Sequence, residues 1–184
     1  MNSLANNHTE NLSGIFGLML ALTSEVSAMP ALNDFGVYTT LPTLVGGASW
    51  GVLEFTEDTA TFKGNPKREG ATTVYKPTIS LKAPKLDPDL SLFIDTYSQA
   101  GFVMAVGDRN GLAYIIGDKE RPARMNIKDL DGGDKVGDYN GATIDLFAYS
   151  TYPLRHCALQ VFPPPPDPRK IFSSGFTFGF LRTE

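Results

Sequence analysis

The stretch from residue 86 to residue 149 constrains the fold of this chain most, because it carries the strongest helix and strand signals. Asp87 has a side chain suited to capping a helix, and Pro88 follows at the first helical position, where its missing N–H costs nothing. Gly101 stands where a left-handed cap would end the helix. These signals predict a helix over residues 88–100. Its apolar face, at helical spacing, consists of Leu90, Phe93, Ile94 and Tyr97.

A β-hairpin is predicted directly after this helix. Two short apolar runs, residues 102–106 and 112–116, are separated by the sequence Gly-Asp-Arg-Asn-Gly. The Asn-Gly pair supplies the positive φ that such a turn needs. A third strand is predicted over residues 141–149, where apolar and polar residues alternate with a period of two. We expect the helix to cover one face of the sheet that these strands form.

The apolar segment at residues 15–22, followed by small residues before Met29, has features of a secretory signal peptide. A signal peptide needs a basic leading region, whereas the first lysine or arginine of the chain is Lys63. The segment is also shorter than the roughly 20 residues of a membrane-spanning helix. We therefore predict a buried strand over residues 13–22, after a polar tip at residues 1–11.

Residues 71–82 contain the clearest strand of the middle region. Pro77 lies inside it and predicts an edge position or a bulge, because proline cannot donate a ladder hydrogen bond. Shorter strands are predicted at residues 50–55, 59–63 and 123–127. Loops are predicted at residues 30–48, at the charged segment 64–70, and over most of 116–141.

Charge and composition exclude several classes of function. The 184 residues include 16 basic and 20 acidic ones, for a net charge of −4. This balance argues against a nucleic-acid-binding protein, which needs a basic patch. It suits a surface that DNA passes without binding. A single cysteine, Cys157, excludes an internal disulfide. The two histidines, His8 and His156, lie far apart in the sequence, which argues against a metal cluster.

Three motifs have both a functional and a structural interpretation. Asp129, Asp131 and Asp134 could hold calcium, but their spacing fails the EF-hand pattern, so we predict a solvated acidic loop. Residues 107–111 and 137–141 share the form Gly-Asp-x-Asn-Gly and are predicted as turns.

The adjacent His156 and Cys157 are the third such motif. Neighbouring residues of a strand point to opposite faces, so the two cannot form a catalytic pair. The chain contains no Walker loop, no His-Glu-x-x-His and no Gly-x-Gly-x-x-Gly sequence. We therefore predict no catalytic, cofactor or metal site, and no enzyme.

From residue 162 onward the chain changes character. A run of four prolines holds an extended polyproline II spacer, and a phenylalanine-rich strand follows it. An apolar strand of this kind left in water would aggregate, so we predict that residues 162–184 form an assembly arm that docks on another subunit. The arm residues are Pro163, Pro164, Pro165, Pro166, Phe172, Phe176, Phe178 and Phe180.

The order of motifs in the centre of the chain is distinctive. A helix precedes a strand, Asp-x-Asn-Gly, a second strand ending in Gly-Asp-x-Glu-x-Pro, an acidic glycine-rich loop, and Gly-Asp-x-Asn-Gly before a further strand. This order resembles structural proteins of tailed phages that infect Bacteroidetes-type hosts, including the crAss-like phages. The resemblance covers residues 12–150 and is specific over residues 86–149. The proline-rich tail departs from the pattern.

The resemblance implies a ring-forming virion protein of the phage tail or neck, with a tail-tube-like fold. Its partners would be copies of itself and adjacent tail or portal-side proteins, with DNA only in passage and no membrane. Some of Asp129, Asp131 and Asp134 are then expected to face the lumen of the ring. A secreted or surface β-sandwich binding module is the alternative.

We therefore predict a mainly β protein with one α-helix, a tail-tube-like β-sandwich or barrel with extended arms. The expected parts are a flexible tip at residues 1–11, a β-rich domain at 12–161 and the arm at 162–184. The predicted core consists of Tyr75, Ile79, Leu81, Phe93, Ile94, Tyr97, Val103, Ile115, Ile144 and Leu146.

Overall fold

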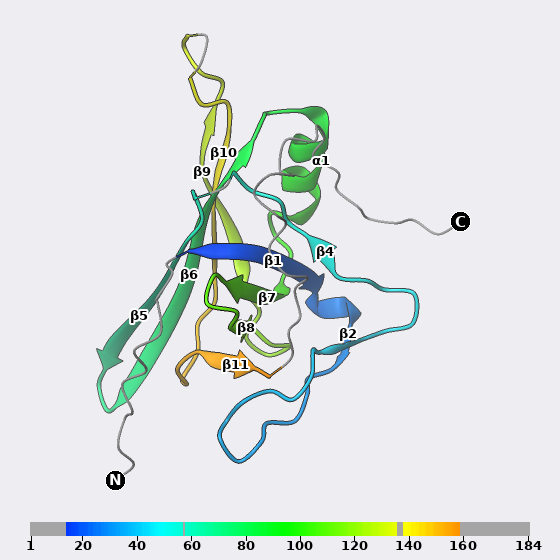
Figure 1. Cartoon of the computed structure of the whole chain (residues 1–184), viewed down its shortest axis with the longest axis vertical. Helices are drawn as coiled ribbons and strands as arrows, with labels where there is room; N and C mark the ends of the chain where they lie inside the picture. Colours follow the sequence, from blue (N-terminus) through cyan, green and yellow to red (C-terminus); the bar gives the residue numbers. More distant parts are fainter. Residues whose placement is uncertain (1–13, 57, 136–137, 159–184) are drawn as a thin grey trace.

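The structure is a computed structural model that describes residues 14–56, 58–135 and 138–158. Within these residues the chain is mainly β with one α-helix, as the sequence predicts (Figure 1). All the strands pair in antiparallel fashion, in a sheet of five strands, a sheet of four strands and a sheet of two short strands.

The five-stranded sheet has the strand order β11-β8-β7-β1-β4. Its strands are β1 (Ile15–Leu22), β4 (Gly51–Val52), β7 (Phe102–Asp108), β8 (Ala113–Ile116) and β11 (Arg155–Cys157). β1 confirms the predicted buried strand, and β7 with β8 confirms the predicted hairpin. In its turn the Asp108 carboxylate accepts the N–H groups of Asn110 and Leu112 at 3.0 and 2.8 Å. Gly111 takes a φ of 78°, as predicted for this turn.

The four-stranded sheet, called the long sheet below, has the order β5-β6-β10-β9. Its strands are β5 (Thr61–Glu69), β6 (Thr72–Pro84), β9 (Arg124–Asp131) and β10 (Gly141–Phe147). The expectation that residues 141–149 join the sheet of the hairpin is wrong. β1 pairs with the free side of β7, and β11 with that of β8, so β10 pairs with β6 and β9 instead.

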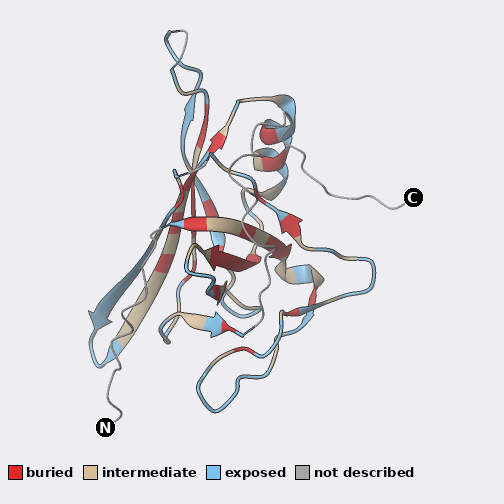
Figure 2. Cartoon of the chain, viewed as in Figure 1, coloured by how far each residue is buried: buried red, intermediate tan, exposed pale blue. Residues whose placement is uncertain are grey.

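The two large sheets pack face to face around a shared core, and the helix α1 (Pro88–Tyr97) covers one end of it. Figure 2 shows the buried residues gathered where the sheets and α1 meet. Buried side chains reach this core from β1, β6, β7, β10 and α1, among them Leu18, Leu81, Leu90, Phe93, Met104, Ile144 and Leu146. Because each strand contributes alternate residues, the period of two seen in the sequence is the signature of this interface.

The opposite face of the five-stranded sheet is also buried. Residues 26–50, which include β2 (Val26–Ala28) and β3 (Thr43–Leu44), supply Val26 and Tyr38 to a second cluster with Val103 and Ile115. β7 is therefore covered on both faces, which explains its unbroken apolar sequence.

Most of the predicted core is confirmed, although it belongs to two clusters. Ile94 and Tyr97 are partly buried against the first cluster, and Tyr75 is half-buried outside both. Seven predicted core residues are buried: Ile79, Leu81, Phe93, Val103, Ile115, Ile144 and Leu146.

The prediction of a loop at residues 64–70 is wrong, because β5 continues to Glu69 in unbroken register with β6. The residues of β5 from position 63 onward are exposed on both faces. A strand that covers no core has no apolar alternation, so its sequence looks like a charged loop.

Pro77 does not mark an edge or a bulge. β6 is an interior strand between β5 and β10, and Pro77 lies in register opposite Gly64. The ladder between β6 and β10 ends at the pair Thr78–Phe147, next to the missing N–H. The Pro77 carbonyl still accepts the N–H of Ala148 at 3.2 Å, so the strand tolerates the lost donor where β10 ends.

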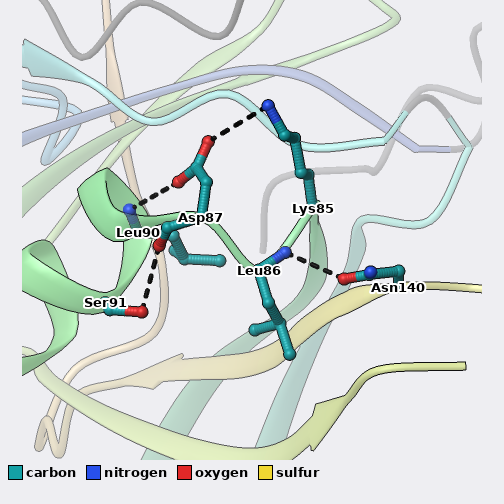
Figure 3. Close-up of polar contacts among 6 residues, drawn as sticks. All are labelled: Lys85, Leu86, Asp87, Leu90, Ser91 and Asn140. Atoms are coloured by element: carbon teal, nitrogen blue, oxygen red, sulfur yellow. Dashed lines mark hydrogen bonds and ion pairs between the residues drawn. The ribbon is translucent and has the colours of Figure 1, made fainter.

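Helix α1 begins as the sequence predicts. The Asp87 carboxylate accepts the N–H of Leu90 at 2.9 Å, and the Ser91 hydroxyl donates to the Asp87 carbonyl at 3.0 Å (Figure 3). Pro88 occupies the first turn. The Asp87 carboxylate thereby supplies an acceptor for an N–H group that has no partner inside the helix.

The end of the helix differs from the prediction. α1 ends at Tyr97 rather than at residue 100, and Gly101 is not in the left-handed conformation. A Cβ at Gly101 would lie 2.8 Å from the Pro122 side chain and 3.0 Å from the Thr23 hydroxyl. Glycine is needed here for a close approach between segments.

The packing of α1 gives a stability prediction. Phe93 is 5% exposed in the core, whereas its neighbour Leu92 is 64% exposed. Phe93→Ala should lower the free energy of unfolding by about 3–5 kcal/mol, because it removes a buried aromatic ring. Leu92→Ala should change it by less than about 0.5 kcal/mol. Urea unfolding of both variants measures this, and a loss below about 1 kcal/mol for Phe93→Ala would contradict the packing.

Candidate functional site

The structure places the three predicted lumen aspartates at one end of the long sheet. Asp129 and Asp131 lie on β9, opposite Thr143 and Gly141, and Asp134 lies in the turn that follows. The predicted acidic loop and the short strand at 123–127 are corrected here, because β9 extends to Asp131 through its pairing with β10. Residues 129–135 and 138–140 are called the acidic tip below.

The aspartates of the acidic tip shape its turn. Asp131 accepts the N–H of Gly133 at 2.9 Å. Asp138 accepts the N–H groups of Lys135 and Asp134 at 2.8 and 3.2 Å. Aspartate commonly stabilises a turn in this way. Within the described part of the chain, no three histidine, cysteine or acidic residues are grouped as metal ligands would be.

The base of the acidic tip is fixed to the rest of the sheet. The Leu86 N–H donates to the Asn140 side chain at 2.9 Å (Figure 3), and the Lys85 N–H to the Asn140 carbonyl at 2.7 Å. The Tyr139 hydroxyl donates to the carbonyls of Ala83 and Ala142 at 2.8 and 3.0 Å. Burial of this hydroxyl, and then the charges of Asp131 and Asp129, raise the Tyr139 pKa. The tip is therefore a positioned element of the sheet.

The other end of the long sheet carries the opposite charge, which the sequence reasoning missed. Residues 63–76, called the basic ribbon below, join the distal parts of β5 and β6. They contain four basic residues and one acidic residue, a formal charge of +3. These residues are Lys63, Lys67, Arg68, Lys76 and Glu69. The clustering of positive charge within 14 residues is a sequence signal for this surface, although the sequence predicts a loop over much of the segment.

The basic ribbon has no cover on either face over most of its length. Every residue from Lys63 to Thr72 is exposed (Figure 2). Lys67 pairs with Glu69 at 3.1 Å, but both side chains are more than half exposed and the pair contributes little. Lys76 is half-buried over the rings of Phe147 and Tyr149. The ribbon therefore presents Lys63, Lys67 and Arg68 to its surroundings.

A buried polar contact joins three strands at the middle of the long sheet. Asp145 is 8% exposed, accepts the Ser80 hydroxyl at 2.5 Å and pairs with Lys128 at 2.7 Å. Because the carboxylate is paired and hydrogen-bonded, its burial is compensated. Lys128 is thereby used inside the molecule and does not offset the charge of the acidic tip.

The tyrosines with the most perturbed pKa values donate hydrogen bonds to aspartates. Tyr114 donates to Asp108 at 3.1 Å and Tyr152 to Asp118 at 3.0 Å. Burial, followed by the neighbouring carboxylate, raises the pKa of each tyrosine to about 12. Arg155 lies on the Tyr152 ring, 3.6 Å from its centroid. These contacts keep the phenols neutral, and a neutral phenol of high pKa is a poor general base at pH 7.

The side chains of Cys157 and His156 make structural contacts and do not face each other. Cys157 is buried and its Sγ donates to the Thr40 carbonyl at 3.6 Å, whereas His156 is exposed beside the Tyr114 ring. The two side chains lie on opposite faces of β11, as predicted. Two surface hollows, one beside α1 and one beside Tyr152, each enclose only about 20 Å³. This is room for a water molecule and not for a substrate of ordinary size.

Several expectations lie beyond what the structure describes. The arm residues between Pro163 and Phe180 are outside the described ranges. No helix among the described residues is long and apolar enough to cross a membrane. Comparison with protein-family models, with curated proteins and with solved structures found no match. The function must therefore be argued from the site itself.

The tyrosine contacts predict a pH dependence of stability. Because both pKa values are raised from 10 to about 12, the stabilisation is present below pH 10 and is lost as the pH rises towards 12. The free energy of unfolding should fall over this window, and less steeply in the variant Tyr114→Phe/Tyr152→Phe. Tyr149→Phe, which changes an exposed tyrosine, is the control and should keep the wild-type dependence of the free energy of unfolding on pH. Equal slopes in all three proteins would contradict the assignment.

Proposed function

We propose that this chain is a structural virion protein, a subunit that forms rings in a bacteriophage tail or neck. The observation that carries the proposal is the long sheet, whose two ends extend beyond the core as exposed hairpins (Figure 2). The order of motifs over residues 86–149, which resembles that of tailed-phage structural proteins, supplies the biological class.

Exposed hairpin ends are a reason to expect neighbouring subunits. A two-stranded ribbon with no packed face is marginally stable alone in water. Contact with another copy would cover it. A contact between two different surfaces of identical chains is heterologous, and it generates a ring wherever the rotation closes. The basic ribbon and the acidic tip are two such different surfaces.

A ring of this kind would surround a channel for DNA in passage. Its inner wall should carry more acidic than basic side chains, because attraction to phosphate would slow the genome. Asp129, Asp131 and Asp134 are our proposed lumen residues, and all three are exposed. Adjacent tail or portal-side proteins would be the further partners.

The alternative of an exported binding module receives no support from the fold. A leader cleaved near Met29 would take β1 with it. β1 lies between β7 and β4 and contributes Leu18 and Leu20 to the core, so the remaining sheet would lose an interior strand.

The proposal predicts a closed oligomer. Purified full-length chain should give a single mass that is an integral multiple of 20.0 kDa, and negative-stain images should show rings with a central opening. The neighbouring genes should encode portal, capsid and tail proteins. A chain that stays monomeric at all concentrations, or a ring with a strongly basic inner wall, would contradict the proposal.

The proposed assembly arm gives a separate test. Deleting residues 163–184 should leave the thermal unfolding of the domain unchanged and weaken or abolish assembly, because the arm is expected to pack on a neighbour. Replacing Phe176, Phe178 and Phe180 by serine in the full-length chain is the matched variant and should have the same effect. If the truncated chain unfolds as a monomer, the segment belongs to its own core.

A further inference from the structure

We propose that the basic ribbon of one copy contacts the acidic tip of a second copy of this chain. The inference rests on the proposed function, because it names the surfaces through which ring subunits would meet. It is carried by the formal charges of the two ends of one sheet, which are equal in magnitude and opposite in sign.

The two charges cannot neutralise each other within one molecule. The acidic tip holds four aspartates and one lysine, a formal charge of −3, against +3 for the basic ribbon. The two ends lie at opposite ends of the long axis of the molecule (Figure 1). Lys67 and Asp129 lie in register with Val74 and Lys82 of β6, which are eight residues apart, so at about 3.3 Å per residue they are separated by roughly 26 Å along the sheet. This is about three times the screening length of about 8 Å at physiological salt.

Both ends present charges that are available to a partner. Among the described residues, the side chains of Asp129 and Lys63 make no hydrogen bond and no ion pair, and the Lys67 side chain has only the exposed pair with Glu69. Asp129 lies opposite Thr143, which lies opposite Lys82, and Lys67 lies opposite Val74. Positions 74 and 82 of β6 share a face, so Lys67 and Asp129 project from the same outward face of the long sheet.

The edges of the sheet favour contact through side chains over strand addition. Pro66 lies opposite Tyr75, whose backbone bonds Ser150 on the other side at 2.8 and 2.9 Å, so the nitrogen of Pro66 is on the open edge of β5. At the other edge, the register of β9 shifts between Ile127 and Asp129. A proline and a bulge both disfavour pairing with another strand. The charged side chains remain as the means of recognition.

A nucleic acid is the other ligand that a basic ribbon could take. The chain as a whole is acidic, and the ribbon exposes three basic residues besides the half-buried Lys76. Every copy already carries a surface whose formal charge is equal in magnitude and opposite in sign, which favours a second copy of this chain as the partner.

The test is a charge swap in the full-length chain. Lys67→Glu and Asp129→Lys each place like charges at the contact, and each should weaken self-association at least about tenfold at low salt. The double variant restores opposite charges with their signs exchanged, and should return to within about threefold of wild type. Lys119→Glu and Glu120→Lys, at exposed residues of the β8–β9 connection, are the matched controls and should behave as wild type.

Sedimentation velocity at about 0.05 M and 0.5 M salt measures these effects, and the wild-type association should weaken at the higher salt. The inference is overturned if the single reversals change association no more than the controls do, or if the double variant is no better than the singles. It is also overturned if Lys67→Glu abolishes retention of a DNA fragment while self-association persists.

The same experiment separates this inference from the proposed function. Rings that ignore the charge reversals would leave the function standing and refute the contact. A charge-dependent dimer, with rescue in the double variant, would support the contact and refute the ring.

Discussion

The packing of β7 on both faces is the constraint on which the rest of the structure depends. Met104 and Val106 face the long sheet, whereas Val103 and Ala105 face the segment of residues 26–50. Since β7 also pairs with β1 and β8, its backbone polar groups are used within the five-stranded sheet. The strand fixes two layers at once, and every other element is placed relative to one of them.

The long sheet follows a different rule, because it is longer than the core that supports it. The buried residues of β6 lie between Pro77 and Ala83, and its first residues run beyond the five-stranded sheet with β5. β9 and its turn extend beyond the core in the other direction. The parts that leave the core lose the apolar alternation that burial requires. What remains at each end is charge.

This division explains how much of the molecule the sequence could predict. Segments with a buried face, such as β1, β7, β10 and α1, carry a periodic or an unbroken apolar pattern, which predicts their bounds closely. The distal parts of β5 and β9 have no buried face, so their sequences predict loops. The sheet that β10 joins was also missed, because strand partners are set by which edges other segments have already filled. The requirement for Gly101 depends on Pro122 and Thr23, which no local pattern contains.

The charges of the acidic tip could be predicted from sequence, but their role depends on the opposite end of the sheet. Taken alone, Asp129, Asp131 and Asp134 suit a wall that repels DNA. Beside a basic ribbon on every copy, the same carboxylates suit a subunit contact. A carboxylate neutralised by a neighbouring lysine contributes little to the field of a channel, so a given residue cannot serve both purposes fully. Asp129 and Lys67 share the outward face, so under our proposal Asp129 belongs to the subunit contact, and the proposed lumen would be lined by carboxylates that the ribbon does not reach.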